Sequence, residues 1–108
     1  MVVSFMKELS SIPLDFNRKL TFRKDGKTFE GKLRIHSLEK CDDLKWICFW
    51  SLDYVCTEGK ARGDDSLNAL TNALYVIHKL IVGTSEDGME IWWQYEGDMG
   101  EILSFITL

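Results

Sequence analysis

Two histidines and three cysteines are the residues of this chain best suited to chemistry. They are His36, His78, Cys41, Cys48 and Cys56. Zinc sites draw on His and Cys at short, regular spacings, but the chain contains neither Cys-x-x-Cys nor His-x-x-x-His. Cys41 and His36 are close enough in sequence to suggest a catalytic pair of a cysteine nucleophile and a histidine base. Proximity in sequence is, however, a poor guide to geometry. We expect no metal site and no cofactor.

Residues 59–64, Gly-Lys-Ala-Arg-Gly-Asp, precede a predicted helix and superficially resemble a phosphate-binding loop. The segment lacks the Gly-Lys-Ser/Thr ending, and two acids stand where a phosphate would dock. It is better interpreted as a loop followed by a helix cap. With no catalytic residue assigned, the sequence predicts a protein that is not an enzyme.

Acidic side chains are distributed unevenly along the chain. Residues 1–36 hold eight bases and four acids, residues 37–108 hold five bases and thirteen acids, and the net charge is −4. No Lys or Arg occurs after residue 83. Such a split makes a directional field that attracts a basic protein and disfavours direct nucleic-acid binding.

Length and composition predict one domain spanning residues 1–108, large enough to bury a core. An odd number of cysteines is typical of reduced thiols in the cytoplasm. The N-terminal residues have no signal-peptide pattern, and no stretch approaches 18 apolar residues, so we expect a cytoplasmic protein without a membrane segment.

The hydrophobic pattern predicts an α+β fold. Residues 18–36 read as a hairpin turning at Asp25-Gly26, residues 45–56 as a long strand, and residues 66–82 as an amphipathic helix capped by Asp64 or Asp65. Residues 37–44 and 57–64 are predicted loops, and residues 89–95 a last strand. We expect an antiparallel sheet of about four strands with one main helix across one face, in β-β-β-α-β order. Residues 1–16 and 97–108 are left unassigned.

Period-two alternation assigns the strand residues to two faces. Phe29, Leu33, Ile35, Ile91 and Trp93 are predicted to face the helix. The other face then carries a mixture of charges and an aromatic residue: Arg23, Lys32, Arg34, Glu90, Trp92, Gln94 and Glu96. An exposed Trp among charges is typical of a protein interface, unless a terminal segment covers it.

The segment 63–74 follows the pattern Gly-x-Asp-x-Leu-x-Ala-Leu-x-x-Ala-Leu. It resembles the helix of an uncharacterised bacterial family in which three strands precede this helix and a Trp-bearing strand follows it. Ile91-Trp92-Trp93 and Asp98-Met99-Gly100 are similar to that family's later strand and closing Asp-x-Gly. The likeness covers about residues 17–101 and implies a fold, with no catalytic residues.

Size, acidity and predicted surface are also similar, by analogy, to small immunity proteins that neutralise toxins in contact-dependent growth inhibition and related systems. We therefore expect a binding protein whose partner is a basic toxin domain, and we expect that domain to be a nuclease. The alternatives are a homo-oligomeric domain, for example a homodimer, and a small ligand-binding protein. The expected partner-binding residues are Asp42, Asp43, Glu86, Asp87, Glu90, Trp92, Glu96, Asp98 and Glu101.

Overall fold

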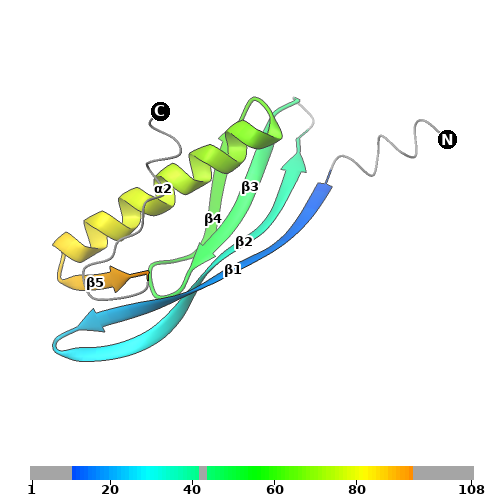
Figure 1. Ribbon diagram of the computed structural model, residues 1–108. Helices are drawn as coiled ribbons and strands as arrows, with labels where there is room; N and C mark the ends of the chain where they lie inside the picture. The colour runs from blue at the N-terminus through cyan, green and yellow to red at the C-terminus, as the bar shows by residue number, and fades with distance from the viewer. Residues whose placement is uncertain (1–10, 42–43, 94–108) are drawn as a thin grey trace.

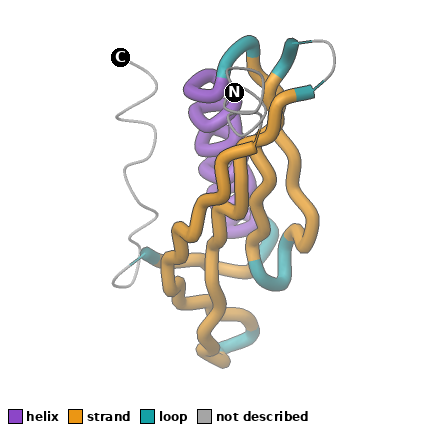
Figure 2. The backbone as a smooth tube through the Cα atoms, turned by 90° about the vertical axis from the view of Figure 1, so that its right-hand side faces the viewer, coloured by secondary structure: helices purple, strands orange, loops and turns teal. Residues whose placement is uncertain are grey.

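The computed structural model describes residues 11–41 and 44–93 (Figure 1). Its strands are β1 (Ser11–Lys24), β2 (Lys27–Lys40), β3 (Trp46–Leu52), β4 (Cys56–Gly63) and β5 (Met89–Trp92), and its helix is α2 (Ser66–Glu86). All strand pairs are antiparallel, in the order β4-β3-β2-β1-β5. The helix lies across one face of this sheet (Figure 2). The predicted α+β class and antiparallel sheet with one helix are confirmed, with five strands rather than about four.

The hairpin between β1 and β2 turns where the sequence predicts. Asp25 and Gly26 both have positive φ, 54° and 76°, and Lys24 pairs with Lys27. A two-residue turn of this kind matches the twist of the flanking strands, which is why Asp-Gly favours it. Both strands are 14 residues long, so the hairpin is the longest feature of the sheet.

The predicted loop at residues 57–64 is wrong, because all of these residues except Asp64 belong to β4. The predicted long strand at 45–56 is instead β3 followed by a turn in which Tyr54 has a φ of 67°. The helix also differs from its prediction at the C-terminal end, where it continues past Gly83 to Glu86. The predicted loop at 37–44 begins later than expected, since β2 continues to Lys40.

Asp65 caps the N-terminal end of α2, as one of the two predicted caps. Its side chain accepts a hydrogen bond of 2.7 Å from the Asn68 backbone N–H, and the Asn68 side chain accepts one of 3.0 Å from the Asp64 N–H. The first bond satisfies a backbone donor that the helix leaves without an internal partner, and the second ties the residue before the cap to the first turn. Neighbouring Asp64 is bonded instead to Lys45, and that hydrogen bond lowers the pKa of the Asp64 carboxyl.

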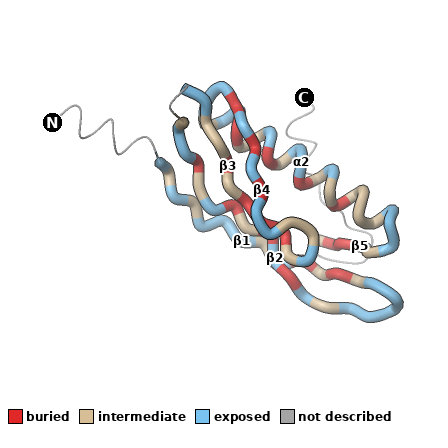
Figure 3. The backbone as a smooth tube through the Cα atoms, turned by 180° about the vertical axis from the view of Figure 1, so that it is seen from behind, coloured by how far each residue is buried: buried red, intermediate tan, exposed pale blue. Residues whose placement is uncertain are grey.

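The core lies between α2 and the sheet, where the buried positions of Figure 3 gather. The helix contributes Ala69, Ala73, Ile77 and Ile81, each with no exposed surface. The strands contribute the rest of the fully enclosed or nearly enclosed apolar residues, which are Leu20, Phe22, Leu33, Ile35, Leu38, Cys48, Trp50, Leu52, Ala61 and Ile91. The predicted helix-facing residues of β2 and β5 belong to or pack against this core.

Candidate functional site

The face of the sheet opposite α2 is here called the open face. Cross-strand partners share a face, so the pairs Lys19 with Lys32, Arg34 with Ser51 and Phe49 with Lys60 place these side chains together. Two shallow hollows of about 230 and 340 Å³ lie on it. The open face is a mixed, largely polar surface, defined by Lys19, Glu30, Lys32, Arg34, His36, Phe49, Ser51, Asp53 and Lys60.

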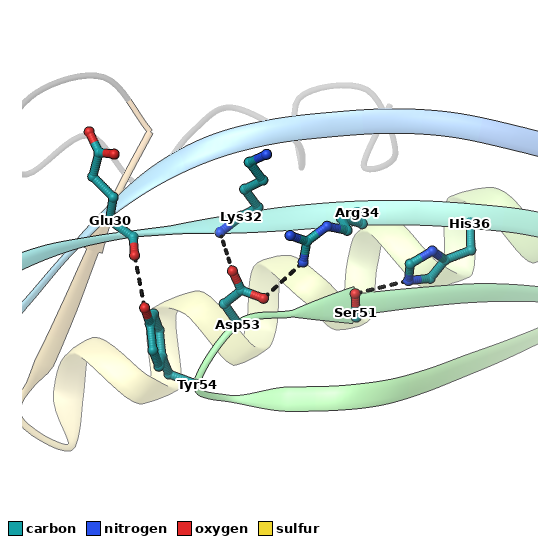
Figure 4. Close-up of polar contacts among 7 residues, drawn as sticks. All are labelled: Glu30, Lys32, Arg34, His36, Ser51, Asp53 and Tyr54. Atoms are coloured by element: carbon teal, nitrogen blue, oxygen red, sulfur yellow. Dashed lines mark hydrogen bonds and ion pairs between the residues drawn. The ribbon is translucent and has the colours of Figure 1, made fainter.

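Asp53 is the centre of the polar contacts on the open face (Figure 4). Its carboxylate accepts a hydrogen bond of 2.8 Å from the Lys32 backbone N–H and one of 2.9 Å from the Arg34 guanidinium. The backbone N–H of Asp53 donates a third hydrogen bond, of 3.1 Å, to the Lys32 carbonyl. Next to it, the Tyr54 hydroxyl donates to the Glu30 carbonyl at 2.9 Å. These bonds fasten the turn after β3 to β2.

We expect Asp53→Ala to lower the free energy of unfolding by about 1–3 kcal/mol, because it leaves a strand N–H and a half-buried Arg34 without their acceptor. Chemical denaturation followed by circular dichroism measures the change. The matched control is Glu30→Ala on the same face, whose 4.0 Å ion pair with Lys19 is exposed and worth little. Equal effects of the two variants would contradict a fastening role for Asp53.

His36 does not act as a base for Cys41, since its hydrogen-bond partner is Ser51. Its Nε2 lies 2.9 Å from the Ser51 hydroxyl. In the described part of the chain no carboxylate is bonded to this histidine, so the group that orients the base of a hydrolytic triad has no counterpart. Ser51 is also 8% exposed, so a substrate has little access to its hydroxyl.

Cys48 is not an activated thiol. All three cysteines are free, and burial raises the pKa of the Cys48 thiol to about 11. A thiol with so high a pKa remains protonated and unreactive at neutral pH. Among residues 11–41 and 44–93, no cluster of three or more His, Cys, Asp or Glu side chains could hold a metal ion.

Three of the predicted partner-binding acids lie together where α2 ends and β5 begins. Glu86, Asp87 and Glu90 are all exposed, and we call them the acidic end. Glu90 is paired in register with Arg23 of β1, and a hollow of about 460 Å³ lies between this connection and the β1–β2 turn. The other predicted acids, Asp42, Asp43, Glu96, Asp98 and Glu101, lie outside the described residues.

The sequence leaves two alternatives for Trp92, exposed or covered, and in the structure its side chain is covered. Only 8% of it is accessible, although its pairing with Thr21 puts it on the strand face expected for it. Its neighbour Trp93 is half-buried, with the Arg18 guanidinium 5.4 Å from the ring centroid. Alternation assigns a residue to one side of a sheet, but it does not give the exposure of that side.

Among the described residues, the most exposed aromatic side chains are ones that the sequence did not single out. Tyr54 is 61% exposed and Phe16 57% exposed. Tyr54 follows the turn after β3, which the prediction of one long strand concealed. Phe16 belongs to a segment, residues 1–16, for which no element could be predicted.

Residues 16–102 match a family model described as a domain of unknown function, DUF6968. The chain belongs to this family. The match contains β2, β3, β4, α2 and β5 in full and β1 from Phe16 onward, so the DUF6968 match extends over the sheet and the helix together. No curated protein and no solved structure matches the chain.

The DUF6968 description assigns no activity. The helix α2 is not long and apolar enough to cross a membrane, and it is the one helix among the described residues. The function has to be argued from the surfaces of the domain.

Proposed function

We propose that this DUF6968 domain is a non-catalytic binding protein that neutralises a basic toxin domain in the cytoplasm. In this proposal it docks through the acidic end. The observation that carries the proposal is the position of Glu86 and Asp87 at the C-terminal end of α2.

Acids at this position oppose the helix dipole. The C-terminal end of a helix carries a partial negative charge, so basic side chains stabilise its last turn and acidic ones destabilise it. In α2 the last turn contains Glu86 and no basic residue, and Asp87 is the C-cap. Local rules of this kind are most often broken at functional positions, where stability is lost for another purpose.

Exposed charges of one sign mainly raise the rate at which a partner of the opposite sign associates. Glu86 and Asp87 are two such charges in the described part of the chain, whereas Glu90 lies opposite Arg23 of β1. The absence of lysine and arginine after residue 83 extends the same sign through the rest of the sequence. A basic nuclease domain, which needs positive charge to bind its substrate, is a complementary partner.

The experiment uses the protein encoded immediately upstream of this chain as the candidate toxin. Its C-terminal domain is expressed alone and together with this chain, and growth and binding are measured. We expect growth arrest alone, rescue by co-expression and a complex in calorimetry. A candidate that arrests growth without being bound or neutralised would contradict the proposed function.

The variant Glu86→Gln/Asp87→Asn separates the charge argument from simple unfolding. We expect it to raise the free energy of unfolding by about 0.3–1 kcal/mol and to slow association with the basic partner in stopped-flow measurements. The control Glu30→Gln/Glu58→Gln changes the net charge by the same amount. It does so through acids of β2 and β4, away from the end of α2. If the control slows association as much, net charge and not the acidic end attracts the partner.

A further inference from the structure

One hollow of the open face has more basic than acidic side chains around it. It is the hollow of about 230 Å³, bordered by three bases, two acids and a glycine, which are Lys19, Lys32, Arg34, Glu30, Asp53 and Gly31. The chain as a whole has a net charge of −4. The sign of the hollow is therefore opposite to that of the acidic end, and the proposed function makes no use of it.

Two of the bases stand directly opposite each other. Lys19 of β1 and Lys32 of β2 are cross-strand partners. The Cβ atoms of such partners are about 4.5–5.5 Å apart, and like charges in this position destabilise the strand pair. Arg34 lies two residues further along β2 and therefore on the same face. An unfavourable local arrangement of this kind is most often found at a functional position.

The two acids of the hollow leave the Lys32 ammonium group unpaired. Asp53 uses one oxygen for the Lys32 backbone N–H and the other for Arg34. Figure 4 shows the Lys32 side chain directed away from this carboxylate. Glu30 is paired instead with Lys19, at 4.0 Å, with side chains 73% and 68% exposed, and such a pair is weak. Within the described part of the chain, Lys32 belongs to no ion pair.

Arg34 adds donors in a fixed orientation. Its Nη1 is held by the Asp53 carboxylate at 2.9 Å, and its side chain is 36% exposed. A guanidinium group has five N–H donors, so the bond to Asp53 leaves others for a ligand. Asp53 is itself fastened to the backbone of Lys32 through both its carboxylate and its N–H. Such preorganisation lowers the entropy lost when a ligand binds.

The size and shape of the hollow favour a small anion. Pockets for drug-sized ligands have volumes of about 300–1,000 Å³, and this hollow is smaller and shallow. A phosphate group presents several oxygens that accept charge-assisted hydrogen bonds, from the fork of an arginine and from lysine ammonium groups alike. The open side of the hollow leaves room for the remainder of a phosphate ester in solvent.

We propose that this hollow binds a phosphate group, held by the ammonium groups of Lys19 and Lys32 and by the N–H donors of Arg34 that Asp53 does not use. The bound anion lies between the two opposed lysines and replaces their repulsion by two attractions. The acids elsewhere on the protein do not prevent this, because exposed charges more than about 8 Å away are largely screened at physiological ionic strength. The source of the group is inorganic phosphate or a phosphate monoester.

Titration of the full chain with inorganic phosphate at constant ionic strength, followed by the NMR signals of the backbone amides, tests the site. We expect saturable shifts centred on β1 and β2 around Lys19 and Lys32. Lys32→Gln is expected to raise the Kd about fivefold or more, through the loss of one charged donor. The control Lys40→Gln, at the other end of β2, changes the net charge equally and is expected to leave the Kd within about twofold. Absence of saturable binding, shifts centred elsewhere, or equal losses in the two variants overturns the proposal.

Glu30→Gln is expected to have the opposite effect. It removes an acid from the rim of the hollow and releases Lys19, so the phosphate Kd is expected to fall about two- to threefold. A general disturbance of the fold would not strengthen binding, and a Kd that stays the same or rises contradicts the role given to Lys19.

A parallel titration with glycerol 3-phosphate distinguishes the two sources of the phosphate group. Tighter binding of the ester than of inorganic phosphate identifies a monoester as the ligand, and equal or weaker binding identifies inorganic phosphate. Failure of both probes to bind overturns the site but leaves the proposed toxin neutralisation untouched, because the acidic end takes no part in it.

Discussion

Replacing Ile77 by alanine is expected to lower the free energy of unfolding by about 2–5 kcal/mol. Ile77 lies in the middle of α2 and has no exposed surface, since it packs into the core between the helix and the sheet. The substitution removes apolar contacts and leaves a cavity that the surrounding residues fill only in part. Urea denaturation followed by circular dichroism measures the change.

Val76→Ala is the matched control, one position away on the same helix. Val76 is 39% exposed, so the change loses little buried area, and alanine favours the helix slightly more than valine. We expect the free energy of unfolding to change by less than about 0.5 kcal/mol. If both variants were equally destabilised, the orientation of α2 on the sheet described here would be wrong.

This pair of residues also shows how far the helical pattern can be interpreted. The sequence places Val76 and Leu67 in the apolar rows of the helix, yet Leu67 is 68% exposed. An apolar stripe identifies the side of a helix that packs on a sheet. It does not give the breadth of the sheet beneath it, so the residues at the margins of the stripe are assigned least well.

The hairpin and the helix cap could be predicted because their causes are local. Asp25-Gly26 adopts its positive φ values through its own backbone preferences, and Asp65 caps the helix through an N–H three residues away. The residue at which the helix ends could not be predicted from local preferences in the same way. Gly83 and Gly88 are both plausible terminators, and Gly88, with a φ of 104°, is the one that adopts the left-handed conformation.

β4 was missed because the residues on its buried face, Gly59, Ala61 and Gly63, are small for reasons that lie elsewhere in the fold. Gly59 is covered by the Trp50 ring, and a Cβ added there would lie 2.1 Å from that ring. Gly63 lies directly beneath the first turn of α2. Glycines in a strand mark places where another group approaches closely, but in sequence they resemble a loop. The contacts that explain them come from residues distant in the chain.

The candidate site was the least predictable part. The acids of the acidic end were identified from their sign alone, and the structure adds that two of them stand at an unfavourable end of a helix. Within residues 11–41 and 44–93, β5 is four residues long and pairs only with Thr21–Lys24, which leaves Ser11–Leu20 of β1 without a described strand on that side, and the sequence pattern could not show this. Exposure of an edge follows from tertiary pairing, which periodicity does not report.

Gly63→Ala and Gly83→Ala apply one chemical change with opposite expected results. A Cβ at Gly63 would lie 2.2 Å from the Ala69 backbone nitrogen and 2.6 Å from the Asn68 carbonyl carbon. Backbone atoms of a capped helix cannot move aside as a flexible side chain does. We therefore expect Gly63→Ala to lower the free energy of unfolding by about 1–3 kcal/mol or more.

At Gly83, inside α2, an added Cβ meets nothing within 4 Å. Alanine is favoured over glycine in a helix interior by about 1 kcal/mol, so Gly83→Ala is expected to stabilise the protein by up to that amount. Thermal and urea denaturation of the two variants beside the parent chain measure both effects. If Gly63→Ala were tolerated as well as Gly83→Ala, the close packing of α2 on β4 would be refuted.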